Sequence, residues 1–239
     1  MRTSPRMTWG WATFPMLCPL FSIILLAVGV AAVAGEDFFP LQVGNTWKYR
    51  HWLRGEPRTE LVTTTSIIGT KSLDDTIYFM LVGHFSRAVS IRDDTVLVRR
   101  SGNQVMLRFG EFDKLWLDFS AETGQSWKLP MRRFPVDLDF EDALITLEST
   151  TDSLTVLGRS FGKALTFHFM PPFIDGDWTE TYVAGIGPVK AEGMAADGPY
   201  LISLVEAEIG GQKLDLTSFL GKDSWGHIKS LYRSRRRER

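Results

Sequence analysis

The sequence predicts an all-β protein, an antiparallel sandwich or barrel-like sheet of about ten to twelve strands with a short C-terminal helix or tail. Two observations carry this prediction. Apolar and polar residues alternate with a period of two, as in residues 46–53 (TWKYRHWL), where Trp47, Tyr49 and His51 share one face. Turn-forming residue pairs separate such segments, and no stretch before residue 217 shows sustained helical periodicity.

The first 34 residues have the layout of a secretory signal peptide. Arg2 and Arg6 form a basic start, and no charged residue follows until Glu36 and Asp37. The most apolar run within this stretch is LFSIILLAVGVAAVA. This arrangement predicts an exported protein, placed in the periplasm or outside the cell.

The predicted cleavage site lies at the end of the apolar run. Ala32 and Ala34 give the small-residue pattern A-x-A, so we expect cleavage after Ala34 and a mature chain that begins at Gly35. The alternative is an uncleaved anchor that tethers the domain, because about 20 apolar residues can span a bilayer.

Composition excludes several classes of protein. The single cysteine, Cys18, lies in the leader, so the mature chain has neither disulfides nor cysteine-ligated metals, and we expect no cofactor. Removal of Arg2 and Arg6 with the leader changes the formal net charge from −1 to −3. A nearly neutral chain argues against a nucleic-acid partner, because such proteins carry a basic surface.

Strand-like segments continue through a predicted β domain at residues 35–216. These segments are rich in β-branched and aromatic residues. After residues 46–53 they lie at 60–68, 76–85, 95–100, 104–109, 143–151, 153–158, 164–170, 180–185, 188–193 and 200–209. The turn pairs are Gly102-Asn103, Gly158-Arg159, Asp175-Gly176, Asp197-Gly198 and Gly210-Gly211.

One motif occurs twice, as FPLQVGNTWKY (residues 39–49) and FSAETGQSWKL (residues 119–129). In both copies a glycine suited to a turn precedes a tryptophan at the start of a strand. We expect both tryptophans, Trp47 and Trp127, to plug the end of the sheet. The alternative is a ligand-binding role for Trp47, Tyr49 and Trp127, in which their rings stack on an apolar small molecule.

These motifs resemble those of a loose group of uncharacterised exported bacterial β-rich proteins. The resemblance rests on F-P-L-x-x-G-x-x-W-x-Y near the mature N-terminus, DFSAETGQSW mid-chain, and YVAGIGPVKAEG (residues 182–193), which fits a late G-[VI]-G-x-V-K motif. It covers most of the mature chain. It implies an exported β-rich domain and carries over no catalytic residue.

A hydrolase acting on envelope glycans or esters is the enzymatic alternative. GRSFG (residues 158–162) matches G-x-S-x-G around Ser160, and Asp175 or Asp177 followed by His227 would complete the order of a catalytic triad. That motif requires a strand–turn–helix, whereas the following residues alternate like a strand. We therefore expect a hairpin at Ser160 and favour a non-catalytic protein.

Two acidic clusters supply oxygen ligands of the kind that calcium binds. The metal-site candidates are Asp175, Asp177 and Glu180 in DGDWTE, and a second cluster spans residues 137–142 (DLDFED). The alternative is that both clusters are solvated loops or strand edges. The histidines are scattered and lack metal-binding spacing.

The C-terminal residues 217–239 form a predicted amphipathic and basic tail. Apolar residues at loosely helical spacing precede RSRRRER, which would favour peripheral contact with an anionic membrane. The alternative is a frayed, solvated end. Taken together, the sequence favours an exported, non-catalytic binding or structural module of the bacterial envelope that holds an apolar ligand or contacts an envelope component.

Overall fold

A computed structural model describes residues 36–53, 56–83, 95–132, 140–171, 176–195 and 198–217. All described residues belong to one compact unit, Ala34–Arg239. The predictions for the leader, for Asp175, for residues 137–139 and for the tail beyond residue 217 fall outside the described residues. Within the described residues, no helix is long and apolar enough to cross a membrane.

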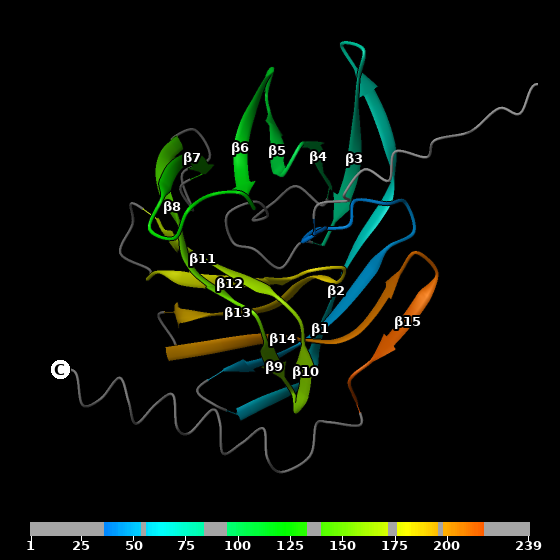
Figure 1. The fold of residues 1–239 in the computed structure, drawn as a ribbon, viewed down its shortest axis with the longest axis vertical. Helices are drawn as coiled ribbons and strands as arrows, with labels where there is room; N and C mark the ends of the chain where they lie inside the picture. The colour runs from blue at the N-terminus through cyan, green and yellow to red at the C-terminus, as the bar shows by residue number, and fades with distance from the viewer. Residues whose placement is uncertain are drawn as a thin grey trace, which may run out of the picture. The chain divides into compact units, whose positions relative to one another are not determined.

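The described residues are organised almost entirely as strands, which confirms the predicted all-β class (Figure 1). The strands are β1 (Thr46–Leu53), β2 (Glu56–Leu73), β3 (Thr76–Val82), β4 (Thr95–Ser101), β5 (Gln104–Phe109), β6 (Phe112–Asp118), β7 (Ser126–Arg132), β8 (Phe140–Thr151), β9 (Leu154–Val156), β10 (Arg159–Phe161), β11 (Ala164–Met170), β12 (Trp178–Val183), β13 (Gly187–Ala195), β14 (Gly198–Ile209) and β15 (Gln212–Asp215).

The main sheet consists of two six-stranded antiparallel meanders. The first runs from β1 to β6 in chain order, and the second contains β7, β8 and β11 to β14. Pairing of β1 with β14 joins the meanders, and β15 adds to β14. At the other ends of the path, β6 and β7 contact each other. The sheet is therefore barrel-like and nearly closed. A separate hairpin, β9–β10, lies between β8 and β11 in the chain, and Val156 of this hairpin belongs to the core.

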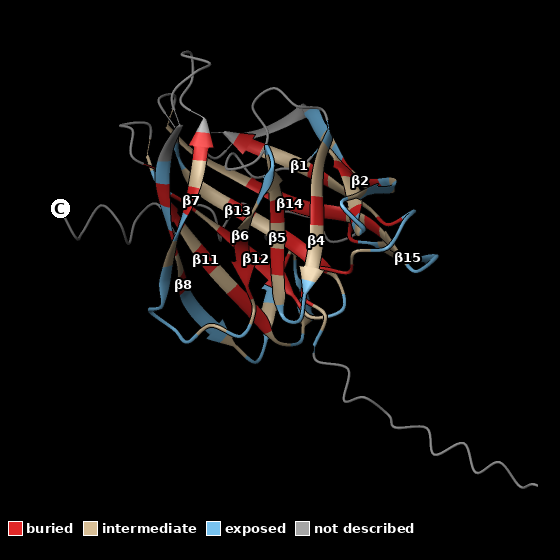
Figure 2. Cartoon of the chain, turned by 90° about the horizontal axis from the view of Figure 1, so that it is seen from above, coloured by how far each residue is buried: buried red, intermediate tan, exposed pale blue. Residues whose placement is uncertain are grey.

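Side chains alternate between the interior and the outer face along these strands. Figure 2 shows the buried positions as red bands on the strands that surround the interior. Aromatic residues dominate the largest fully buried side chains, among them Trp47, Trp116, Tyr49, Tyr182 and Phe167. The period-two pattern of the sequence therefore places one face of each strand in a shared core.

Several predicted turns lie at strand boundaries. Gly102–Asn103 joins β4 to β5, and Gly210–Gly211 joins β14 to β15. The turn in the β9–β10 hairpin falls one residue earlier than expected, at Leu157–Gly158. Asp74 and Asp75 join β2 to β3 with φ values of 49° and 59°. Short acidic side chains tolerate this left-handed conformation better than most residues do.

The first copy of the repeated motif forms a turn followed by a bulge. The backbone N–H of Asn45 donates to the carbonyl of Gln42 at 3.1 Å, with Gly44 at a φ of 93°. Gly44 N–H then donates to the carbonyl of Ile67, and Ile67 N–H donates to the carbonyl of Asn45. Gly44 and Asn45 thus lie opposite the single residue Ile67, which defines a glycine-type β-bulge. The first position of this bulge has a positive φ, which explains why glycine is required.

The second copy repeats this geometry at the start of the second meander. Gly124 has a φ of 90°, and its N–H donates to the carbonyl of Leu147 at 2.8 Å. Leu147 N–H donates to the carbonyl of Gln125 at 3.0 Å. The chain therefore carries the motif twice because each meander begins with the same turn, bulge and tryptophan.

Candidate functional site: an aromatic plug beside a buried carboxylate

The residues that follow the leader are fixed to the sheet by polar contacts. The Arg100 guanidinium pairs with the Asp37 carboxylate and donates to the carbonyl of Phe39 at 2.6 Å. The N–H of Gly185 donates to the carbonyl of Asp37 at 2.7 Å. These contacts from β4 and from the β12–β13 turn hold Phe38 and Phe39 inside the sheet.

Phe39 is the centre of an aromatic cluster. Its ring centroid lies 5.7 Å from that of Trp47, 5.8 Å from Trp116 and 5.9 Å from Tyr182, and all four side chains are completely buried. The ring of Phe38 stacks on Phe119 at 5.4 Å. We name this cluster the aromatic plug; it consists of Phe38, Phe39, Trp47, Trp116, Phe119 and Tyr182.

Trp47 and Tyr49 have no exposed surface, and their polar atoms bind backbone carbonyls. The indole N–H of Trp47 donates to the carbonyl of Ile186 at 2.6 Å, and the Tyr49 hydroxyl donates to the carbonyl of Pro188 at 2.9 Å. Gly187 lies between these acceptors with a φ of 98°, and a Cβ there would lie 3.1 Å from the Trp47 indole nitrogen. The G-I-G-P segment is thus shaped to receive Trp47.

The side chains of Asn45 and Asp118 form hydrogen bonds that fix the two chain segments next to the plug residues Phe39 and Phe119. The Asn45 amide donates to the carbonyl of Pro40 at 2.8 Å and accepts from the N–H of Gly210 at 2.9 Å. Burial alone would raise the pKa of Asp118, but hydrogen bonds from Ser120 and Gln104 outweigh burial and hold this pKa below its ordinary value of 3.8. The DFS segment thereby forms a fixed turn that presents Phe119 to the plug.

Trp127, the third predicted ligand-binding residue, is half-buried at the boundary between the meanders. Its indole N–H donates to the carbonyl of Trp116 at 3.1 Å, and its ring packs edge-on against Phe167 at 6.0 Å. Trp47, Tyr49 and Trp127 therefore belong to the packed interior, as the plug prediction requires. A ligand role for them stays a prediction, and it would require this packing to open.

A buried carboxylate lies in the same interior. Glu180 is fully buried, accepts from the Trp178 indole N–H at 2.9 Å and accepts from the Tyr182 hydroxyl at 2.8 Å. All three residues share the inward face of β12, where Glu180 lies opposite Phe167 and Ala191 on the neighbouring strands. Interior packing therefore surrounds a polar carboxyl group that is held by two hydrogen bonds.

This carboxylate alters the chemistry of the nearby tyrosines. Burial raises the pKa of both Tyr49 and Tyr182 well above 10, and the negative charge of Glu180 raises these pKa values further. Both hydroxyls therefore remain protonated and act as hydrogen-bond donors at physiological pH. Tyr182 belongs to the plug and binds Glu180, so it links the two parts of the site.

Asp177 and Glu180, the two described residues of the predicted metal site, are separated in the structure. Asp177 precedes β12, is exposed and lies 2.7 Å from His168 Nε2 through its Oδ2 atom, whereas Glu180 points into the interior. From the second cluster, Asp142 is exposed and lies 3.6 Å from the Lys128 ammonium. Across the described ranges, no three His, Cys, Asp or Glu side chains form a group that could hold a metal.

Ser160 lies in the β9–β10 hairpin, as expected. Its Oγ atom is exposed and lies 3.3 Å from Thr155 Oγ1 across the hairpin. A strand on each side of the turn replaces the strand–turn–helix that positions a nucleophilic serine. The geometry required for the hydrolase alternative is therefore not present around Ser160.

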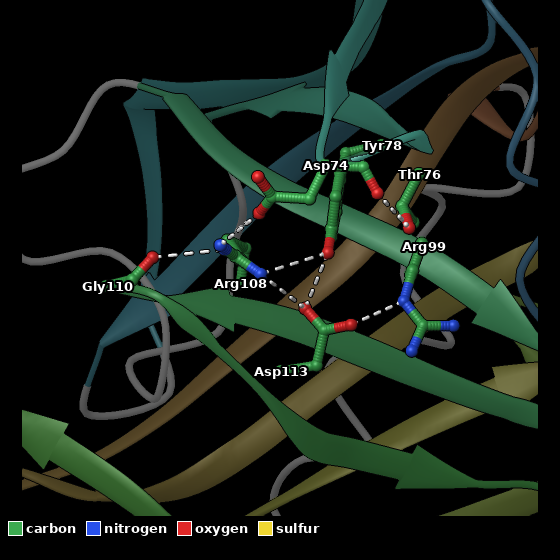
Figure 3. A network of polar contacts seen from close by, with 7 residues as sticks. All are labelled: Asp74, Thr76, Tyr78, Arg99, Arg108, Gly110 and Asp113. Atoms are coloured by element: carbon green, nitrogen blue, oxygen red, sulfur yellow. Dashed lines mark hydrogen bonds and ion pairs between the residues drawn. The ribbon is translucent and has the colours of Figure 1, made fainter.

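A polar network on the outer face was not anticipated from the sequence (Figure 3). Asp113 accepts from the Tyr78 hydroxyl at 2.9 Å and from Arg99 Nε at 2.5 Å. Arg108 donates to the Tyr78 hydroxyl at 3.4 Å and to Asp74 at 3.2 Å. Two guanidinium groups thus face two carboxylates across β3 to β6.

The position of this network follows from strand periodicity. Tyr78, Arg99 and Arg108 each adjoin an interior residue in sequence, so their side chains lie on the opposite face of the sheet. That alternation was visible in the sequence, but the pairing of four strands was not. The network connects the strands of the first meander, and its charges are balanced.

Comparisons with known proteins identify no family. No family model matches the chain, and no curated protein matches it. A crystal structure named "putative lipoprotein" from Parabacteroides distasonis ATCC 8503 aligns at 11% identity and a TM-score of 0.41, covering 71% of this chain and 97% of that chain. A "putative exported protein with YmcC-like fold" from Bacteroides fragilis NCTC 9343 aligns at 12% identity and a TM-score of 0.44, covering 74% and 99%.

Proposed function

We propose that the protein is an exported, non-catalytic binding or structural module of the bacterial envelope. The leader at residues 1–34 supports export, and the resemblance of the F-P-L, D-F-S and G-I-G motifs to exported β-rich proteins agrees with it. The observation that carries the non-catalytic role is that the candidate reactive groups are held apart. Glu180 is buried inside the sheet, the Asp177 side chain is exposed, and Ser160 lies on a separate hairpin.

The packed interior limits how an apolar ligand could be held. Phe39, Trp47 and Trp116 occupy the plug with no exposed surface. A ligand in contact with Trp47 or Tyr49 would have to displace these rings, whereas a partner on the outer face would not. We therefore favour recognition through the outer face or through a partly opened interior.

Export and cleavage are tested by the mass of the protein recovered from bacteria that produce the full chain. We expect a mature chain that begins at Gly35, found outside the cytoplasm. The variant Ala34→Glu is the matched control, because it removes the small residue before the cut and should retain the leader. An exported chain of full mass would favour the membrane-tethered alternative, and a full-length chain confined to the cytoplasm would refute the proposal.

A further inference from the structure

The two ends of the sheet path meet without a backbone ladder. β6 and β7 contact each other, but within the described residues β6 pairs only with β5 and β7 only with β8. The other junction, between β1 and β14, is a ladder along all of Thr46–Leu53. We name the boundary between Phe112–Asp118 and Ser126–Arg132 the seam.

The repeated motif indicates that the two meanders are equivalent. The absence of a ladder at the seam is therefore a departure from that internal symmetry. Residues 46–50 pair with residues 66–62, and residues 126–130 pair with residues 146–142 in the same register. β7 is therefore the counterpart of β1, and β6, the last strand of the first meander, is the counterpart of β14. By this symmetry the seam would carry a ladder like that between β1 and β14.

Pro130 explains part of the departure. Hydrogen-bonding direction alternates along an antiparallel strand. The carbonyl of Gln125 accepts from the N–H of Leu147 of β8, so the backbone N–H and C=O groups of odd-numbered residues point toward β8. The backbone groups of even-numbered residues of β7 therefore point away from β8. Pro130 is one of these even-numbered residues. Because proline has no backbone N–H, β7 lacks a hydrogen-bond donor toward the seam at this position. Its counterpart, Arg50, pairs with Ser203 in the β1–β14 ladder.

Side chains connect the two sides of the seam instead. The Trp127 indole N–H donates to the carbonyl of Trp116 across the seam at 3.1 Å. The ring of Phe119, which follows β6, packs edge-on against Phe167 at 5.7 Å, and Trp127 contacts the same ring. On β12, the residue opposite Phe167 is Glu180.

From this arrangement we propose that the seam is a lateral opening of the sheet. β6 and β7 separate reversibly in the folded protein and give access to the apolar interior around Phe167, while the β1–β14 junction stays closed. Opening the seam breaks side-chain contacts alone, whereas opening the other junction also breaks a backbone ladder along Thr46–Leu53. Local opening follows the boundary with fewer backbone hydrogen bonds.

The test uses thiol labelling, because Cys18→Ser leaves the chain without another cysteine. Ala143→Cys places a buried thiol on β8 opposite Leu129 of β7, one strand from the seam, and Ala207→Cys places one opposite Trp47 in the β1–β14 ladder. Both alanines belong to the core, so the pair is matched. We expect Ala143→Cys to react at least about ten-fold faster under native conditions. Equal rates, or a faster Ala207→Cys, would overturn the proposal.

Trp127→Phe supplies the second measurement, because it keeps an aromatic ring and removes the hydrogen bond to Trp116. Loss of this hydrogen bond should make the open state easier to reach. We therefore expect the labelling rate of the cysteine in Ala143→Cys to rise about five-fold. The rate at Ala207→Cys should stay unchanged, since a local opening does not involve that junction. An equal acceleration at both positions would show global unfolding and would contradict a lateral opening.

Discussion

Replacing Trp47 by alanine is expected to destabilise the protein by about 3–5 kcal/mol, the range typical of large aromatic residues removed from a core. Trp47 is completely buried, and its ring packs against Phe39. The substitution also leaves the carbonyl of Ile186 without the indole donor that lies 2.6 Å away. Because the backbone of Gly187 lies so close to the indole that a Cβ there would be 3.1 Å from its nitrogen, that side of the cavity is formed by backbone, which has little freedom to collapse.

Urea unfolding of the purified protein measures this effect. Phe112→Ala is the matched control, because Phe112 is an aromatic residue that is 68% exposed. Substitution at such a surface position typically changes the free energy of unfolding by less than about 0.5 kcal/mol. Equal effects of Trp47→Ala and Phe112→Ala would mean that Trp47 does not belong to the core.

The second large effect is expected at Glu180. Glu180→Ala removes the acceptor of two buried donors, the Trp178 indole N–H and the Tyr182 hydroxyl. Each buried donor left without its acceptor costs about 1–3 kcal/mol, so the loss of stability should reach about 2–6 kcal/mol. A carboxylate is difficult to keep in an apolar interior, but these two hydrogen bonds offset part of that cost.

Two further variants separate the buried hydrogen bonds from the charge. Glu180→Gln keeps one carbonyl oxygen, so its loss of stability should be smaller than that of Glu180→Ala. Glu206→Ala removes an exposed carboxylate that pairs with Lys48 at 3.0 Å, and such surface pairs contribute about 0–1 kcal/mol. The expected order of destabilisation is Glu180→Ala, Glu180→Gln, then Glu206→Ala. A Glu180→Ala protein as stable as the wild type would contradict the assigned role of the carboxylate.

Local sequence patterns predicted the fold class because they report strand periodicity and turn chemistry directly. Gly44 and Gly124 indicated the two turns, and Trp47 was expected to lie in a plug. The β-bulges at these glycines follow from the same positive φ that makes glycine favourable there. The sequence did not reveal that the two copies begin two equivalent meanders.

The composition of the plug could not be predicted because it depends on contacts between distant segments. Trp116 and Tyr182 reach Phe39 only after the meanders curve around the same interior. For Glu180 a signal existed, since it alternates with Trp178 and Tyr182 along a strand. Its acidic neighbours instead made it a candidate metal ligand. Distinguishing the two interpretations requires the direction of each side chain, which the pairing of β12 determines.

The indole N–H of Trp47 gives the most direct test of the central claim, that paired meanders close around an aromatic plug. Trp47→Phe assigns its signal in the ¹⁵N-resolved NMR spectrum, and hydrogen exchange of the wild-type protein in D₂O then follows that proton. We expect slow exchange, limited by opening of the protein, because the indole is fully buried and bound to the carbonyl of Ile186. Exchange as fast as that of an indole free in water would contradict the account.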